Sequence, residues 1–240
     1  MISAIIPARM GSTRLPGKPL ADIGGTPMVV HTLRAAKHHP AIDRVCVATD
    51  HADIANVVRQ HGGEAILTSA DHTTGTDRCL EVWEKWGDDG AVLNLQGDEP
   101  FPESAHIAAI CAGLQKAQTD VVTAMRPATN QEHLLSERVK VATNQHHRAL
   151  YFSRSAIPHG GPYFVHLGIY GFSPGMLQTC AQLPVGRMEN IEKLEQLRWL
   201  EAGIQIEVAQ VNAAHGPGPV DTEQDLARVR LWHDNVSKST

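Results

Sequence analysis

Short apolar runs alternate with longer segments of helical spacing along the first half of the chain. The runs predict strands at 2–6, 43–48, 64–67, 91–96 and 120–125. The segments between them predict helices at 27–38, 51–61, 76–86 and 103–116. This alternation is typical of an α/β protein with a mostly parallel central sheet covered by helices on both faces.

The pattern changes after about residue 126. Two strand-like segments, 138–143 and 148–152, flank a polar turn and predict a hairpin, and a further strand is expected at 165–172. We interpret 126–172 as a smaller β-rich excursion beside the sheet, available for a partner subunit. A helix at 189–200, a strand at 204–209 and a last helix from about 222 return to the α/β pattern, so we predict a single domain, 1–240.

Composition narrows the class of protein. The net charge of −5 argues against a nucleic-acid binder, which usually carries a basic excess. No apolar stretch reaches the roughly 20 residues that span a bilayer, and the N-terminus lacks the pattern of a secretory signal. The four cysteines are widely spaced without a C-x-x-C pair, which predicts reduced thiols and a cytoplasmic location.

The first predicted strand runs directly into a Gly/Pro loop that carries Arg9, Arg14 and Lys18. Such a loop offers backbone N–H groups and positive charge to phosphates. It is not a kinase-type phosphate loop, because five residues separate Gly11 from Gly17 and a proline follows Lys18 where Ser or Thr is needed. We therefore predict a triphosphate site built by other rules.

Two acidic residues are candidate metal ligands. Asp98 follows the strand predicted at 91–96, at the sheet edge where ligands of open α/β sheets bind, and its carboxylate suits Mg²⁺. The alternative for Asp98 is an ordinary Gly-Asp turn. Asp221 precedes Thr222 and Asp225, which form a capping-box pattern, so its alternative role is to start a helix.

The loop at 68–78 is rich in hydroxyl side chains and glycine. It suits hydrogen bonds to a nucleotide base or sugar, and equally a helix cap at Thr76 or Asp77. Arg154, His166 and Tyr170 fall on or near adjacent predicted strands. An arginine offers a planar fork to a carboxylate, although each of the three also fits an ordinary surface or packing position.

The helix predicted at 189–200 places Ile191, Leu194 and Leu197 on its inner face. Glu195 and Gln196 border that face. Their side chains are either solvated or directed at a polyol.

Taken together, these segments resemble the 3-deoxy-manno-octulosonate cytidylyltransferases, the CMP-Kdo synthetases, over about residues 4–230. The similar runs, in family order, are IPARMGSTRLPGKPL (6–20), ATD (48–50), DH (71–72), GTDR (75–78), NLQGDEP (94–100), VKV (139–141), YFSRS (151–155), HLGIYG (166–171), LEQLR (194–198) and VDT (220–222).

The resemblance implies a Rossmann-like nucleotidyltransferase fold and a homodimer. It also implies Mg²⁺-dependent transfer of CMP from CTP to the anomeric C2 hydroxyl of 3-deoxy-D-manno-octulosonate (Kdo), with release of pyrophosphate. The product, CMP-Kdo, serves lipopolysaccharide synthesis.

The resemblance assigns a role to each matching residue. The residues that resemble the nucleotide site are Ala8, Arg9, Arg14, Lys18, Thr73, Gly75, Arg78 and Gln96. Those that resemble the sugar-acid site are Gln96, Arg154, His166, Tyr170, Glu195 and Gln196. Lys18, Asp98 and Asp221 are expected to be catalytic, and Asp98 and Asp221 to hold the metal.

Several alternatives stay open. The segment between Pro158 and His166 is shorter than is usual in the family, so 8-amino-3,8-dideoxy-manno-octulosonate or another sugar acid also fits. Other nucleotidyltransferases, such as one for a nonulosonic acid or one that uses a different base, are further alternatives. An alternative of another class is a catalytically inactive nucleotide-binding regulatory protein.

Overall fold

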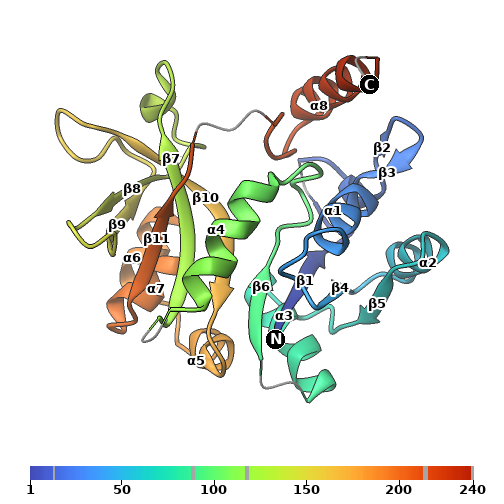
Figure 1. Cartoon of the computed structure of the whole chain (residues 1–240), viewed down its shortest axis with the longest axis horizontal. Coiled ribbons are helices and arrows are strands. Elements are labelled where there is room, and N and C mark those ends of the chain that lie inside the picture. Colours follow the sequence, from blue (N-terminus) through green and yellow to red (C-terminus); the bar gives the residue numbers. More distant parts are fainter. Residues whose placement is uncertain (13, 88–89, 117–118, 213–215, 239–240) are drawn as a thin grey trace. The chain divides into compact units, whose positions relative to one another are not determined.

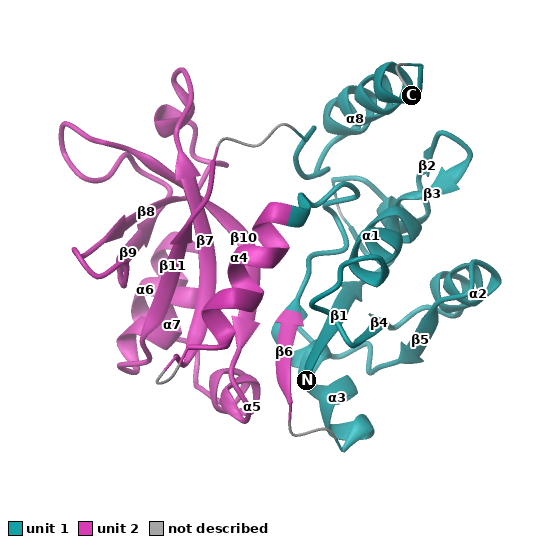
Figure 2. Cartoon of the chain, in the orientation of Figure 1, with its two compact units in different colours: residues 1–88, 94–104, 214–240 teal, residues 89–93, 105–213 magenta. Residues whose placement is uncertain are grey.

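The computed structural model describes residues 1–12, 14–87, 90–116, 119–212 and 216–238. The contacts divide the chain into two units (Figure 2). The first unit consists of Met1–Asp88, Asn94–Ser104 and Ala214–Thr240, and the second of Asp89–Leu93 and Ala105–Ala213. The whole predicted β-rich excursion, 126–172, falls in the second unit, and the reading of 1–240 as one domain stays a prediction.

The first unit contains the predicted parallel strands. Its strands β1 (Ile2–Ala8), β4 (Arg44–Thr49) and β5 (Glu64–Leu67) pair in that order (Figure 1). The apolar side chains of β1 from Ile2 to Ile6 and of β4 from Cys46 to Ala48 are buried, because helices cover them, whereas Leu67 at the end of β5 is 47% exposed. The helices are α1 (Met28–Lys37), α2 (Ala52–Gln60) and α3 (Gly75–Trp86), each within two residues of its expected bounds.

The structure tests the two predicted helix caps, of which one is confirmed and one is wrong. Thr222 and Asp225 form the predicted capping box at the start of α8 (Glu223–Ser237). The cap of α3 is Thr74, whose side chain accepts from the backbone N–H of Asp77, so the prediction of Thr76 or Asp77 as the first residue is wrong. The reason is that Asp77 acts as the third residue of this capping box and returns a bond to Thr74.

Helix α8 packs on a small apolar cluster beside the opening loop. The loop adds a short 3₁₀ helix at Lys18–Leu20 and the strands β2 (Asp22–Ile23) and β3 (Thr26–Pro27), which are too short for a pattern-based prediction. The buried members of the cluster are Leu15, Ile23, Met28, Val220, Leu226 and Val229. This cluster connects the opening loop to the segment around position 220.

The second unit has a mixed sheet. Strand β7 (Val121–Pro127) pairs in parallel with β11 (Ile206–Gln210) and antiparallel with β10 (Phe164–Phe172). Strands β8 (Lys140–Thr143) and β9 (Ala149–Ser153) form the predicted hairpin, and β8 also pairs with β10. The unit boundary falls within β6 (Ala91–Asn94).

Helices and short turns complete the second unit. They are α4 (Ser104–Leu114), the 3₁₀ turn Glu132–Leu134, and the unpredicted α5 (Met176–Ala181). A Cβ at Gly113 of α4 would lie 2.7 Å from the Val122 side chain of β7. Helix and strand therefore approach closely there, which requires glycine.

The helix predicted at 189–200 is wrong as a single element. The structure has α6 (Arg187–Glu192) and α7 (Gln196–Glu201), separated by Lys193 in the left-handed region with φ 56°. The break lets Glu189 turn back and form two short hydrogen bonds, of 2.5 and 2.6 Å, with the Arg198 guanidinium. It also leaves Ile191 63% exposed, contrary to the predicted inner face.

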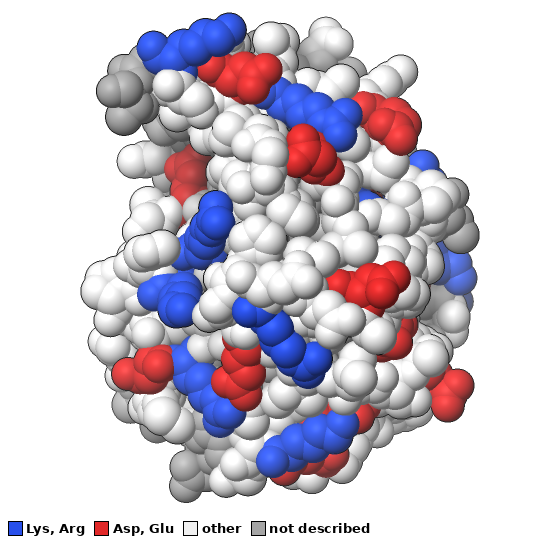
Figure 3. Space-filling view, turned by 90° about the vertical axis from the view of Figure 1, so that its right-hand side faces the viewer, with Lys and Arg blue, Asp and Glu red and all other residues white. Residues whose placement is uncertain are grey.

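Charge is distributed evenly over the face shown in Figure 3. Lys and Arg side chains lie beside Asp and Glu side chains across it, in keeping with the small net charge. Within the described part of the chain, no helix combines the length and apolar character needed to cross a membrane.

One ion pair of the second unit lends itself to a stability measurement. Arg126, which is 8% exposed, donates from both terminal nitrogens to Glu132 over 2.7 Å each. The backbone and hydroxyl of Thr129 also donate to this carboxylate. The Arg126 hydrogen bonds, aided by Thr129 and opposed by desolvation, lower the pKa of Glu132 to about 2.

We expect Glu132→Gln to lower the free energy of unfolding at pH 7 by about 2–3 kcal/mol, because the depressed carboxylate pKa reports stabilisation of the charged form. A depressed folded-state pKa stabilises the protein above the unfolded value. The difference between wild type and variant should therefore shrink as the pH falls from about 4.5 to about 2. Urea unfolding at several pH values measures it. Glu84→Gln, on the surface of α3, is the control and should show no such trend.

Candidate active site

A cavity of about 280 Å³ opens at the carboxyl end of β1 in the first unit. Its wall is built by the loop after β1, the start of α3, the loop after β6 and the residue before the α8 cap. It contains every residue predicted for the nucleotide and the metal: Ala8, Arg9, Arg14, Lys18, Thr73, Gly75, Arg78, Gln96, Asp98 and Asp221. The fold thus brings together positions up to 213 residues apart in sequence, although their roles stay predictions.

The opening loop is shaped by local turns. Gly17 has φ 71°, in the left-handed region that favours glycine, and it precedes the 3₁₀ helix that begins at Lys18. The Ser12 hydroxyl accepts a hydrogen bond from the backbone N–H of Leu15 over 3.2 Å. Thr13, part of the matching run, lies outside the described residues. The turns direct the Lys18 side chain back toward the loop after β6.

The Lys18 ammonium lies between the two candidate metal carboxylates. Its Nζ donates to Asp98 Oδ2 over 3.0 Å, to Asp221 Oδ1 over 3.2 Å and to the Val220 carbonyl over 2.8 Å. These three contacts use all three hydrogens of the ammonium. Arg14 adds a contact of 3.2 Å to the same oxygen of Asp221. The Lys18 ammonium thus bridges the two carboxylates.

The chemistry of this donor set fits Mg²⁺. Both side chains are carboxylates and a backbone carbonyl lies beside them, which matches the oxygen preference of a hard cation. The described residues contain no cluster of three or more His, Cys, Asp or Glu side chains suited to a metal. Mg²⁺ often binds through one or two carboxylates plus substrate phosphates, so two carboxylates suffice.

Gly97 allows the loop after β6 to approach β1. A Cβ at this position would lie 2.8 Å from the Pro7 carbonyl oxygen, and the residue is buried. The loop continues to Asp98, whose carbonyl accepts from the backbone N–H of Val220 over 2.9 Å. The two carboxylate segments are therefore joined through their backbones as well as through Lys18.

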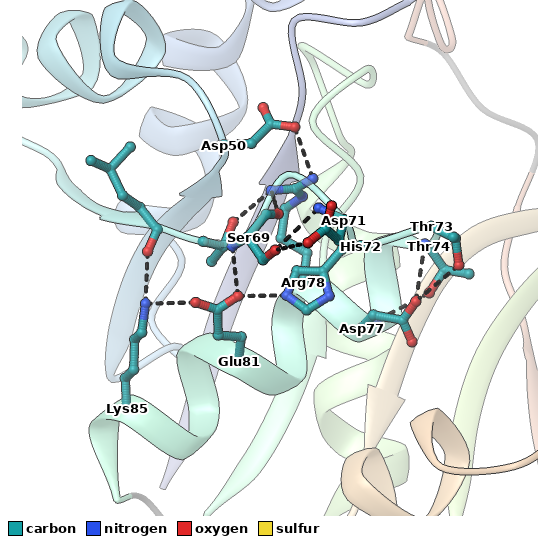
Figure 4. A network of polar contacts seen from close by, with 12 residues as sticks. Asp50, Ser69, Asp71, His72, Thr73, Thr74, Asp77, Arg78, Glu81 and Lys85 are labelled. Carbon is teal, nitrogen blue, oxygen red and sulfur yellow. Dashed lines mark hydrogen bonds and ion pairs between the residues drawn. The ribbon is translucent and has the colours of Figure 1, made fainter.

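The loop before α3 is held by a buried guanidinium (Figure 4). Arg78, which is 3% exposed, donates to the Thr68 hydroxyl over 2.5 Å and to Asp50 over 3.0 Å. It also donates to the carbonyl of Ser69 over 3.2 Å. Arg78 lines the cavity as predicted, and its contacts with the protein give it a second task, which is to shape the loop.

His72 lines the same cavity and was not among the predicted site residues. Its Nε2 lies 2.5 Å from Glu81 Oε2, and Lys85 binds the other oxygen of Glu81 over 2.6 Å (Figure 4). Desolvation would raise the pKa of Glu81, but the bonds from Lys85, the Ser69 backbone and His72 outweigh it and lower the pKa to about 2. The signal for His72 was its place in the matching Asp71-His72 run.

The remaining predicted sugar residues lie in the second unit. His166 packs against Phe152 and Tyr170, and this desolvation lowers its pKa to about 3, so the ring is neutral at pH 7. The Thr123 hydroxyl donates to the Ile169 carbonyl over 2.8 Å, so His166 Nε2 is the donor in their 2.9 Å contact. Its Nδ1 is thereby fixed as an acceptor.

Tyr170 and the start of α7 complete this set. Burial raises the pKa of Tyr170 well above 10, so its hydroxyl stays protonated and can donate. Glu195 lies close enough to add to this effect. Gln196 is the first residue of α7 and is 5% exposed, so neither it nor Tyr170 is an ordinary solvated side chain.

Arg154 follows β9 and faces the break between α6 and α7. Its Nε donates to the Glu192 carbonyl over 2.7 Å, and its terminal nitrogens donate to the carbonyls of Ser136 and Lys193 over 3.2 and 3.3 Å. Three of the five guanidinium N–H groups are thus bound among the described residues. One N–H remains on each terminal nitrogen, so the guanidinium can still donate to a carboxylate.

Comparison with known proteins bears on both units. Residues 3–206 match the model of a family described as cytidylyltransferase. Relatives named 3-deoxy-manno-octulosonate cytidylyltransferase include one from Rhodopseudomonas palustris (strain BisB18), 46% identical over 94% of this chain and 95% of its own. Another, from Pectobacterium carotovorum subsp. carotovorum (strain PC1), is 44% identical over 95% and 96%.

A solved structure of a similar protein has the same fold as this chain. The structure of CMP:2-keto-3-deoxy-manno-octonic acid synthetase complexed with CTP has a TM-score of 0.92 to this chain, with 40% identity over 98% of each. The prediction of a Rossmann-like nucleotidyltransferase fold is confirmed by this likeness.

The close approach at Gly97 can be tested by adding one methyl group. Gly97→Ala should lower the free energy of unfolding by about 1–3 kcal/mol, because the Pro7 carbonyl that the Cβ meets is backbone and yields only if β1 and the loop separate. Gly11→Ala is the matched control, since a Cβ there has no neighbour within 4 Å. Urea unfolding compares the two, and equal stabilities would contradict the role given to Gly97.

Proposed function

The chain belongs to the cytidylyltransferase family, and from this premise we propose that it moves CMP from CTP to the anomeric C2 hydroxyl of Kdo. Pyrophosphate leaves, and CMP-Kdo forms for lipopolysaccharide synthesis. The observation that carries the proposal is the convergence of Lys18, Asp98 and Asp221 on one wall of the cavity that holds all the matching nucleotide residues.

The cations of the opening loop balance the negative charge of CTP. CTP is strongly anionic, and Arg9, Arg14 and Lys18 lie on the cavity wall. The side chains of Arg9 and Arg14 and the backbone N–H groups of the loop hold the β- and γ-phosphates, and the Lys18 ammonium, whose three hydrogens bind the protein, adds its positive charge beside them. As the α–β bond breaks, the same groups stabilise the charge that collects on pyrophosphate. Positioning and charge stabilisation account for most of the catalysis of such transfers.

Asp98 and Asp221 hold Mg²⁺ in this proposal. When bound, the metal would supply positive charge against the phosphates and would make the attacking hydroxyl more acidic. The chain's own contribution is to keep the two carboxylates together, through Lys18 and through the backbone bond from Val220 to Asp98.

The sugar acid is recognised by complementary groups. The two remaining N–H groups of Arg154 bind its carboxylate. The neutral His166 accepts from a hydroxyl through Nδ1, and Tyr170 and Gln196 donate to others. Gln96, Glu195 and the residues named here are the set that the family resemblance implies.

We further propose that the enzyme works in the cytoplasm as a homodimer. The four free cysteines are all buried thiols, which suits a reducing compartment. The dimer follows from the family resemblance, with the β-rich segment 126–172 as the region available to a partner.

Pyrophosphate release tests the function and its alternatives. We expect the wild type to release pyrophosphate with CTP, Mg²⁺ and Kdo, and to do so much faster than with ATP, GTP or UTP. A parallel series compares Kdo with its 8-amino analogue and with a nonulosonic acid. Release with another base, or with the nonulosonic acid alone, would indicate a different nucleotidyltransferase, and no release at all with CTP would indicate a regulatory protein.

The metal role is tested at Asp98. Asp98→Asn should reduce kcat by about two orders of magnitude or more, because an amide ligates Mg²⁺ poorly and neutral asparagine weakens the paired charge. Mn²⁺ binding, followed by electron paramagnetic resonance in the presence of CTP, should weaken in parallel while the circular dichroism spectrum is unchanged. Normal turnover or unchanged Mn²⁺ affinity would remove Asp98 from the metal site.

A further inference from the structure

Lys140 is a buried cation whose ammonium contacts only carbonyl oxygens among the described residues. The residue is 0% exposed, and its Nζ donates to the carbonyls of Leu135, Arg138 and Arg154 over 2.8, 2.5 and 2.5 Å. Three donations require all three hydrogens of the ammonium form. Burying a charge is costly unless it is fully hydrogen-bonded, so this arrangement depends on all three carbonyls being in place.

These three carbonyls belong to two segments that meet at Arg154. Leu135 and Arg138 lie in the loop between β7 and β8, and Arg154 directly follows β9. Lys140 itself pairs with Ser153 in the hairpin register. The ammonium therefore holds the backbone of Arg154 against the 135–138 loop, whose Ser136 carbonyl accepts from the Arg154 guanidinium.

Glu192 also binds the backbone of Arg154. Its carboxylate accepts from the backbone N–H of Arg154 over 2.9 Å and from the Ser153 hydroxyl over 2.8 Å. Its carbonyl and that of Lys193 accept from the Arg154 side chain, because the left-handed turn at Lys193 ends α6 there. The helix break thus supplies two of the three acceptors of the guanidinium.

The arrangement determines which N–H groups of Arg154 remain. Every acceptor of the guanidinium is a backbone carbonyl whose position depends on Lys140, on Glu192 or on the turn that follows Glu192. Moving any of them rotates the guanidinium and the two N–H groups that it still offers. A bidentate carboxylate contact is sensitive to such a rotation, since both bonds must form together.

We propose that Lys140 and Glu192 are positioning residues for Arg154, and that they set the orientation in which it binds the carboxylate of the sugar acid. The inference rests on the proposed function. It gives the VKV run a role that the nucleotide and metal sites leave unexplained. A purely structural lysine would affect stability and both substrates alike, whereas a positioning residue affects the sugar acid selectively.

Steady-state kinetics of Lys140→Met tests this selectivity. Methionine keeps most of the volume and removes the donors, so we expect the KM for the sugar acid to rise about tenfold or more. The KM for CTP should stay within about twofold, since the nucleotide cavity belongs to the first unit. Lys116→Met is the matched control: it removes a lysine of the same unit that pairs with Glu207 at the surface, and should change neither KM.

Glu192→Gln keeps the test decisive if Lys140→Met fails to fold. An amide cannot accept at both positions, so the sugar-acid KM should rise about threefold or more, with CTP affinity by calorimetry unchanged. Arg154→Ala provides the cycle: alone it should lose sugar-acid affinity and retain CTP binding. In that background the Glu192→Gln effect on the sugar-acid KM should largely disappear, because the group that it positions is gone.

The kinetic results of these variants distinguish failure of the positioning role from failure of the proposed function. Folded variants that bind CTP and keep the wild-type KM for the sugar acid overturn the positioning role while the proposed function stands. An equal rise in both KM values, or full additivity with Arg154→Ala, also overturns it. A wild type that neither binds nor turns over any sugar acid ends both proposals together.

Discussion

The site in the first unit depends on one electrostatic constraint: two carboxylates are held beside each other. Asp98 and Asp221 carry like charges, so their approach without a cation between them would cost free energy. The Lys18 ammonium contacts both, and Arg14 contacts Asp221, so two positive and two negative charges form one cluster. The cluster is compatible with folding because its charges balance within it.

The surrounding structure serves that constraint. Gly97 lets the loop come against β1, the backbone bond from Val220 to Asp98 joins the two segments, and the buried Val220 side chain anchors the second of them in the apolar cluster under α8. The packing of Val220 and the backbone hydrogen bond to Asp98 therefore fix position 221 independently of the charge of Asp221. This independence matters, since an ion pair at a partly exposed position stabilises little by itself.

The sequence predicts most of the fold because hydrophobic periodicity decides it. Strands such as β1 and β4 and helices such as α1 and α2 bury a regular apolar pattern, and their bounds were predicted to within a few residues. The residues predicted for the nucleotide were chosen by resemblance to a known family, and the structure places all of them around one cavity. Lys193 was missed because a non-glycine residue in the left-handed region carries no pattern, and His72 because its partner Glu81 lies on the following helix.

Hydrophobic periodicity says nothing about the role of a buried charged residue. In the second unit, buried cations fall into two groups according to their hydrogen-bond partners. Arg126 with Glu132 and Arg198 with Glu189 are paired cations, each with a carboxylate that accepts from two of its nitrogens. Lys140 is satisfied by carbonyls of two segments, so its stability is tied to where those segments lie. A paired arginine can be replaced together with its partner at modest cost, whereas a lysine bound only to backbone links its own burial to the geometry of Arg154. If packing were the only requirement at position 140, an apolar residue of similar volume would be expected there. The linkage to Arg154 explains why the residue is a lysine.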